Sequence, residues 1–136
     1  MAIKDIKSQL VQSVTLSAVV GASATVNGLV IDNADNELGL MFAVRAAAYT
    51  AGTASVLLEE SKTGAFAGEQ NVVPSDKIIG SLSDVILSAA YAVGNVIPTV
   101  GVFANKRYVR ASLVGDASAA LLGEIIVTQK AEIVPV

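Results

Sequence analysis

The sequence contains no histidine, no cysteine and no tryptophan. Histidine is the side chain that most often acts as a general acid or base near neutral pH, so its absence removes the commonest catalytic group. Without cysteine there can be no disulfide framework, no thiolate nucleophile and no cysteine-ligated metal. We therefore predict that the chain is not an enzyme and that it binds no cofactor and no metal.

Charge is also scarce. Only 15% of the residues are charged, 53% are hydrophobic, and the formal net charge is -3. A net negative chain has no general electrostatic attraction to nucleic acid, so no nucleic-acid partner is expected. Because soluble monomers seldom leave large apolar patches in water, a surface so poor in charge favours assembly with other copies or other proteins.

The length of 136 residues lies near the commonest size of a single domain. The sequence shows no internal repeat and no low-complexity linker, which predicts one domain over residues 1–136. The first nine residues, "MAIKDIKSQ", are polar enough to form a flexible N-terminal arm that orders on a neighbour; the alternative is a frayed terminus.

Two stretches imitate membrane-directed segments. Residues 1–24 begin like a signal peptide, but Asp5 lies in the part that should be basic, and polar residues interrupt the apolar part. Residues 85–105 are uncharged and long enough to span a bilayer, yet Gly94 and Pro98 break the run. Two strands joined by a turn explain the second stretch better, and no membrane partner is expected.

Alternation of apolar and polar residues with period two, together with abundant valine and isoleucine, predicts strands throughout. In "SVTLSAV", residues 13–19, it places Val14, Leu16 and Ala18 on one face of a half-buried strand. The next stretch, "ATVNGLVID", contains an Asn-Gly pair that forms either a bulge or a tight turn.

Further along, residues 38–48 and 54–61 are predicted to form an antiparallel hairpin around "YTAGT". Residues 62–83 are rich in turn residues and predict a long loop or short edge strands. The remaining expected elements are one helical turn or a strand over 84–92, and strands over 95–104, 107–114 and 119–129, with tight turns at "NK" and "GDAS". Short strands at such regular spacing predict an all-β fold, an antiparallel β-sandwich or a barrel.

Candidate sites for chemistry are weak. Glu59 and Glu60 are neighbours, so on a strand they point to opposite faces and cannot share a proton; we expect both at a solvent-exposed strand end. "DNADNE", Asp32 to Glu37, has oxygen ligands at alternating positions like the start of a calcium loop. It lacks the glycine and the distal glutamate of such a loop, which favours an ordinary Asx-rich turn.

The strongest local signal is "ANKRYVRASLV", residues 104–114, which holds three of the nine cations of the chain. On an extended strand Lys106, Tyr108 and Arg110 point one way, while Arg107 points the other way with the apolar residues. One interpretation is a solvated strand face with cross-strand partners such as Glu124 or Glu59. The other is an anchor for an acidic partner, because tyrosine and arginine often carry binding energy. We predict a partner interface at Lys106, Arg107, Tyr108 and Arg110.

The same stretch carries a resemblance to a known group of proteins. "VLLEES", followed after a long loop by "FANKRYVRASLV" and then "GEIIV", resembles a pattern in small virion proteins of tailed bacteriophages. In that pattern a "LQESDDG"-like strand end precedes a "GNKRYVRV"-like strand. The resemblance is strongest over Asn105 to Arg110, and this chain departs from it at Ala104, where the family often has glycine.

The resemblance implies a capsid decoration, or cement, protein of jelly-roll type that lies on the outer surface of the capsid in the virion. Such a protein binds the major capsid protein and braces neighbouring capsomers, and a site of three-fold symmetry favours a homotrimer. The alternative is another virion component, such as a tail-tube, neck or fibre-associated β domain. A host-directed carbohydrate-binding sandwich is less favoured, because it needs exposed aromatic residues and the chain has only three tyrosines and three phenylalanines.

Overall fold

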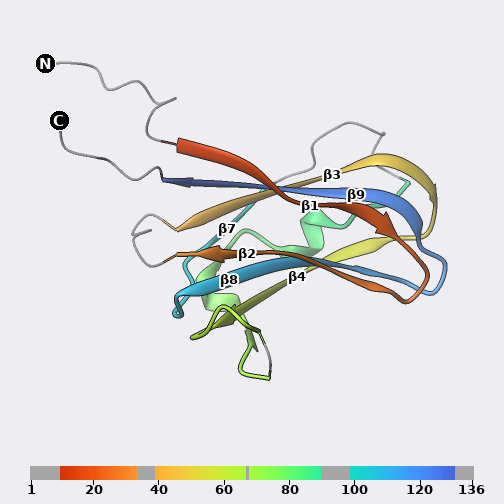
Figure 1. Cartoon of the computed structure of the whole chain (residues 1–136). Helices are drawn as coiled ribbons and strands as arrows, with labels where there is room; N and C mark the ends of the chain where they lie inside the picture. The colour runs from red at the N-terminus through yellow and green to blue at the C-terminus, as the bar shows by residue number, and fades with distance from the viewer. Residues whose placement is uncertain (1–9, 34–38, 67, 90–98, 131–136) are drawn as a thin grey trace, which may run out of the picture.

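The computed structural model describes residues 10–33, 39–66, 68–89 and 99–130. Two antiparallel sheets pack face to face, which confirms the predicted all-β sandwich (Figure 1). The first sheet has the strand order β1-β9-β3-β7-β6, and the second sheet has the order β2-β8-β4-β5. No helix in the described ranges is long and apolar enough to cross a membrane.

Among the described residues, six strands have eight to twelve residues, and the other three have two or three. The first sheet contains β1 (Leu10–Val20), β9 (Ala120–Lys130), β3 (Leu40–Ala51), β7 (Val100–Val102) and β6 (Ile78–Ile79). The second sheet contains β2 (Thr25–Asp32), β8 (Tyr108–Gly115), β4 (Ala54–Ser61) and β5 (Asn71–Val72). Two 3-10 turns, η1 (Ser75–Lys77) and η2 (Leu82–Val85), join these strands in the region predicted as a loop with short edge strands.

The pairs of strands are nested along the chain. β1 pairs with β9, β2 with β8, β3 with β7, and β4 with β5, all antiparallel. This is the pairing that results when one long hairpin rolls up into two sheets, which is the jelly-roll arrangement. The jelly-roll-like topology expected from the resemblance is therefore confirmed, with β6 added at the edge next to β7.

The predicted hairpin of residues 38–48 with 54–61 is wrong. β3 lies in the first sheet, where β7 and β9 occupy its two sides, and β4 lies in the second sheet. The two strands face each other across the core, and the chain crosses between the sheets at Gly52, which has a φ of 74°. A side chain at Gly52 would meet the backbone nitrogen of Ala119 at 2.5 Å, so this crossing needs glycine.

The turns expected at "NK" and "GDAS" are also crossings between sheets, because β8 lies in the second sheet while β7 and β9 lie in the first. The basic strand is therefore not one arm of a local hairpin. Alternation along each strand specifies which side chains are buried, but it does not specify which neighbouring strand supplies the hydrogen bonds.

β1 contains a bulge that the alternation does not reveal. Its register against β9 shifts between Val14 and Leu16, which leaves Thr15 as the extra residue. Val14 consequently faces solvent while Leu16 faces the core, so the predicted common face of Val14, Leu16 and Ala18 is wrong at Val14. The Thr15 side chain is buried instead, and its hydroxyl lies 3.5 Å from the Ile125 carbonyl oxygen to which it donates.

The Asn-Gly pair of β2 forms the bulge that was one of its two predicted outcomes. The register of β2 against β8 shifts between Asn27 and Val30. A side chain at Gly28 would collide with the Ala111 carbonyl oxygen and would lie 3.2 Å from the Thr15 carbonyl oxygen. The bulges of β1 and β2 therefore meet at this edge of the sandwich, where only glycine permits such a close approach.

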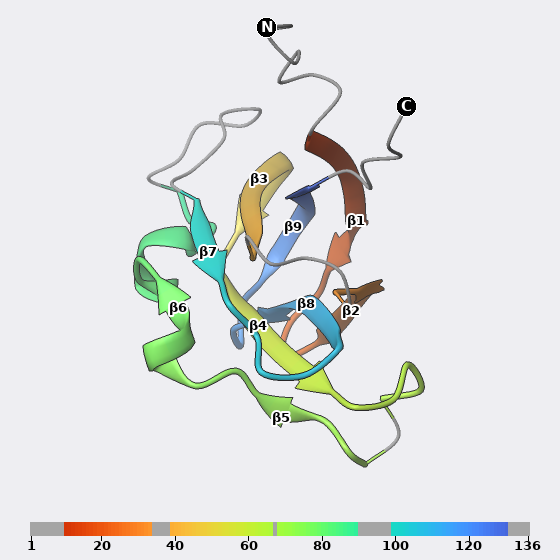
Figure 2. The same ribbon diagram turned by 90° about the vertical axis from the view of Figure 1, so that its left-hand side faces the viewer.

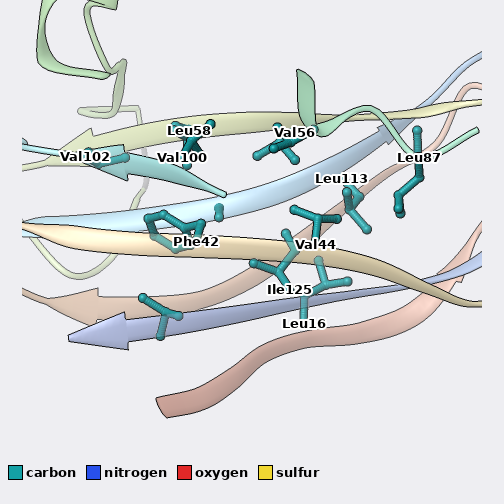
Figure 3. Close-up of a cluster of buried hydrophobic side chains, with 14 of the residues drawn as sticks. Leu16, Phe42, Val44, Val56, Leu58, Leu87, Val100, Val102, Leu113 and Ile125 are labelled. Carbon is teal, nitrogen blue, oxygen red and sulfur yellow. The ribbon is translucent and has the colours of Figure 1, made fainter. Parts of the chain in front are cut away.

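The core lies between the two sheets (Figure 3). Phe42 from β3 and Ile125 from β9 face Leu58 from β4 and Leu113 from β8, and all four side chains are fully buried. Leu87 enters the same core after η2, where its backbone exchanges two hydrogen bonds with Ala54. Burial of these side chains is the main favourable contribution to the folding free energy.

Three predictions fall wholly or partly on residues outside the described ranges. They are the N-terminal arm over 1–9, most of the Asx-rich turn over 32–37, and the first part of the strand predicted over 95–104. η2 begins the stretch over 84–92 as a helical turn, and the structure describes that stretch up to residue 89.

Candidate partner interface

The four predicted interface residues lie at the corner where the chain passes from β7 to β8 (Figure 2). Lys106 and Arg107 precede β8, Tyr108 is its first residue and Arg110 its third. Val109, Ala111 and Leu113 of the same strand are fully buried in the core, as their alternation predicts. β8 is central in the second sheet, between β2 and β4, so both neighbours contribute to the surroundings of the basic residues.

Arg110 lies on the outer face of the second sheet, directly opposite Glu59 of β4. Its Nη2 donates to Glu59 Oε1 over 2.9 Å, and the two side chains are only 14% and 12% exposed. The ring of Phe66 covers the guanidinium at 4.6 Å from the ring centroid. For Arg110 the structure thus shows a cross-strand ion pair with Glu59, as one interpretation predicted, but shielded rather than solvated.

Phe66 reaches Arg110 from the connection between β4 and β5. It is buried and has a φ of 47°, an uncommon backbone conformation for a residue with a side chain. Sequence reasoning missed Phe66 because nothing local indicates which strand the ring will cover. The only signal is an aromatic residue among small ones in "GAFAG".

Arg107 is held by Asp32 of β2. Its Nε and Nη2 donate to the two carboxylate oxygens of Asp32 over 3.0 and 2.8 Å. Its guanidinium also lies 5.2 Å from the centroid of the Tyr108 ring. The prediction that Arg107 points away from Tyr108 is therefore wrong, because Arg107 precedes β8 and strict alternation does not apply to it. Its side chain remains 55% exposed.

Lys106 and Tyr108 contact the residues that follow β4. The Lys106 ammonium lies against the side-chain amide of Asn71 on β5, with the amide oxygen oriented to accept. The Tyr108 ring is half-buried and lies beside Gly64, where even an added methyl group would touch it at 3.5 Å. The connection between β4 and β5 therefore packs against these residues. We call Lys106, Arg107, Tyr108 and Arg110 together the basic corner.

Glu60 corrects another prediction. Glu59 and Glu60 do point to opposite faces, but neither is solvent-exposed as predicted: the Glu59 side chain is 12% exposed and Glu60 is only 3% exposed. Its Oε2 accepts a hydrogen bond from the backbone nitrogen of Asn105 over 2.8 Å. A buried carboxylate needs such a donor, and the corner before β8 supplies it. The sequence could not reveal this bond, since the two residues are 45 positions apart.

Three carboxylates from neighbouring strands thus hold the basic corner: Asp32, Glu59 and Glu60. Asp32 also begins the stretch that resembles a calcium loop, and its carboxylate is engaged by Arg107. Within the described ranges no group of three or more acidic residues is placed to hold a metal ion. The result is a basic surface whose side chains and backbone are held by these carboxylates. Arg107 is its most exposed member and is accessible to another molecule.

No family model and no curated protein matches the sequence. Among solved structures, the fold is similar to part of the PBSX exported protein XepA, with a TM-score of 0.58 and 16% identity over 93% of this chain. The chain spans 39% of the length of XepA. PirA gives a TM-score of 0.40 at 9% identity, covering 96% of this chain and all of PirA.

A structure titled "Bacillus endospore appendages form a novel family of disulfide-linked pili" gives a TM-score of 0.36 at 14% identity, covering 90% of this chain and 88% of that chain. At such low identities the likeness to XepA concerns the fold alone, and the two lower scores add no argument. The comparisons therefore support a β-sandwich shared with part of XepA.

Proposed function

We propose that this chain is a non-enzymatic structural protein of a bacteriophage particle, and specifically a decoration, or cement, protein. It binds the major capsid protein on the outer surface of the head and stabilises contacts between capsomers. The observation that carries the proposal is the nested jelly roll, an architecture that recurs in viral capsid domains. The "FANKRYVRASLV" resemblance occurs on β8 of that jelly roll and on the corner before it.

Two further observations support a structural role. XepA, whose fold is similar in part, is a PBSX exported protein, which is compatible with a place outside the cell for this chain. The low charge of the chain suits a protein that buries much of its surface against neighbours. A decoration protein works by burying surface across adjacent capsomers, so many bound copies stabilise the assembled shell by mass action.

Within this proposal, the basic corner is the surface that contacts the partner. Arg107 and Lys106 are the members that can meet an acidic partner, while Arg110 and Tyr108 support them from within. Charges at the edge of an interface mainly raise the association rate and make it depend on salt. We expect head binding to weaken as the ionic strength rises.

The direct test is cosedimentation of the purified protein with empty, expanded heads of the phage that encodes it. Saturable binding at a fixed ratio to capsomers supports a decoration protein. Absence of head binding, or assembly of the protein into rings or tubes, contradicts the proposal and favours a component of the tail or neck instead. Light scattering on the free protein tests the homotrimer that the resemblance implies.

Replacement of Arg107 by serine tests the corner itself. We expect R107S to weaken head binding at low salt by roughly tenfold, about 1.4 kcal/mol, and to reduce its salt dependence. The matched control is K77S, which removes one cation that is not among the predicted interface residues, from η1 between β5 and β6. Equal binding by the two variants would remove the basic corner from the interface.

A further inference from the structure

On the outer face of the first sheet, residues of β1, β9 and β3 that lie opposite one another form rows across the strands. Its central row contains Ser17 on β1, Glu124 on β9 and Arg45 on β3, which lie directly opposite one another in the register. Arg45 Nε donates to Glu124 Oε2 over 2.8 Å, and the Arg45 side chain is 39% exposed. This ion pair is the only charged pair on the face among the residues whose side chains the structure describes.

The rows on both sides of the ion pair are apolar. On one side Val14, Ile126 and Ala43 lie opposite one another, and on the other side Val19, Leu122 and Ala48 do so. Val14 is 52% and Val19 is 72% exposed. Figure 1 shows β1, β9 and β3 forming one layer of the sandwich, with the second sheet on the opposite side of it.

We propose that this face binds the same face of a second copy of the chain, sheet against sheet. The two copies are related by a two-fold axis that lies in the interface and runs along the strands, between β9 and β3. Aligned packing of two sheets about 10 Å apart is a common arrangement of β-sandwich layers. The inference does not depend on the proposed role on a phage head.

Charge complementarity selects this occupant. The proposed axis brings Arg45 of each copy over Glu124 of the other, so the two ion pairs form a four-membered network of alternating sign. The same axis lays each apolar row on its own equivalent. A symmetric dimer needs such a self-complementary patch, because both copies use the same residues. A face with only one sign of charge would instead repel itself.

The size of the face is sufficient for a weak but specific contact. β1 and β9 have 11 residues each and β3 has 12. The proposed axis lays β9 of each copy over β3 of the other, and lays β1 over the short β7. At about 3.3 Å per residue and about 4.8 Å between strands, β9 and β3 with the matching parts of β1 and β7 cover a flat area of roughly 450 Å² per copy. Two copies then bury on the order of 1,000 Å², the lower limit for a specific interface.

The second sheet does not offer an equivalent surface. Its own Arg–Glu pair is covered by Phe66, and Asn27 and Ser112 form a hydrogen bond on the same outer face. A homotrimer built on other contacts would leave the first sheet free to join two trimers. The expected signature is therefore a halving of the particle mass when the contact is broken, whatever the mass of the smaller unit.

The test uses opposite charge changes in two separate variants. R45E makes the face wholly acidic and E124R makes it wholly basic, so each variant should show half the wild-type mass by light scattering. A mixture of the two should recover the wild-type mass, because each acidic face meets a basic one. The double variant R45E/E124R keeps the alternating signs and should keep the wild-type mass; circular dichroism checks that every variant is folded.

A matched pair of valine variants locates the contact. V14K places a charge on the part of β1 that the proposed axis lays over β7 of the other copy, and we expect the dissociation constant of the contact to rise at least tenfold. V72K places the same charge on β5, at a valine that is also exposed, and should leave the mass unchanged. The proposal is overturned if the wild type already has the mass of R45E, if the mixture fails to recover the larger mass, or if V72K and V14K behave alike.

Discussion

Each of the two sheets carries one arginine paired with one glutamate directly across a strand boundary on its outer face. Arg45 lies 2.8 Å from Glu124 in the first sheet, and Arg110 lies 2.9 Å from Glu59 in the second. The chemistry and the geometry are the same, but the Phe66 ring covers the second pair and the first pair is open to solvent on the side of Arg45. The covered pair can only support the fold, whereas the open pair remains able to meet a partner.

Because the two ion pairs differ in solvent exposure, we expect them to contribute differently to the free energy of unfolding. An exposed ion pair contributes between zero and about 1 kcal/mol, because water and salt screen it. Removal of one member of a shielded pair leaves the other charge with neither water nor a partner, which costs about 3 to 5 kcal/mol when burial is complete. Three measurements test whether the two sheets differ in this way, and a fourth concerns a carboxylate that is held without a cation.

The largest effect is expected from R110A. The substitution leaves the Glu59 carboxylate, whose side chain is only 12% exposed, without its cation, so we expect the free energy of unfolding to fall by about 3 kcal/mol. Urea unfolding followed by circular dichroism measures it. A loss below about 1 kcal/mol would mean that the pair is as well solvated as that of the first sheet.

The next effect is expected from F66A. Loss of the ring removes buried apolar area and the cation–π contact with Arg110, and we expect a loss of about 2 kcal/mol. A double-mutant cycle of F66A with R110A isolates their interaction, which should be about 1 kcal/mol. Strict additivity of the two losses would show that the ring does not shield the pair.

A smaller effect is expected from R45A in the first sheet. The pair is partly open, so the loss should be about 0.5 kcal/mol when the protein is dilute enough to be dissociated into its smaller units. The loss should also shrink in high salt, unlike the loss for R110A. Comparison of the two variants at low and high salt is therefore the most direct measure of the cover that Phe66 provides.

The smallest effect concerns Asp116, an exposed carboxylate held by hydrogen bonds instead of a cation. Hydrogen bonds from the Ser118 backbone and the Thr53 hydroxyl lower its pKa below the ordinary value of 3.8. A lowered pKa in the folded state stabilises the protein at pH values above 3.8, and this contribution is lost as the pH falls toward the folded-state pKa. D116N should lower stability slightly at pH 7 and flatten the acid limb of the stability curve below about pH 4.

Some of this comparison could be predicted from the sequence. Alternation on β8 predicts that Val109, Ala111 and Leu113 share one face, and the sequence offers Glu59 as a cross-strand partner for the basic stretch; both are confirmed. Glu124, the other partner that the sequence offers, lies opposite Arg45 instead. These successes depend on period-two alternation, which a strand imposes locally.

The failures concern which strands become neighbours. Nothing near residues 38–61 indicates that both sides of β3 will be filled by β7 and β9, which come from much later in the chain. The bulge at Thr15 turns the Val14 side chain toward solvent, and no glycine or proline in the sequence marks the bulge. Phe66 and Glu60 acquire their roles through contacts with β8 and with the corner before it, so their burial depends on tertiary structure.

The nested pairing of the strands also has a consequence for the order of folding. β4 and β5 pair residues as close in sequence as Glu60 and Asn71, whereas β1 and β9 pair residues as distant as Leu10 and Lys130. Closing a longer loop costs more chain entropy, and folds dominated by distant contacts form slowly, so we expect β1 to pair with β9 last. Those are two of the strands that form the proposed contact between copies. A chain that has not finished folding would then lack the surface through which it assembles, and self-association would be restricted to completed molecules.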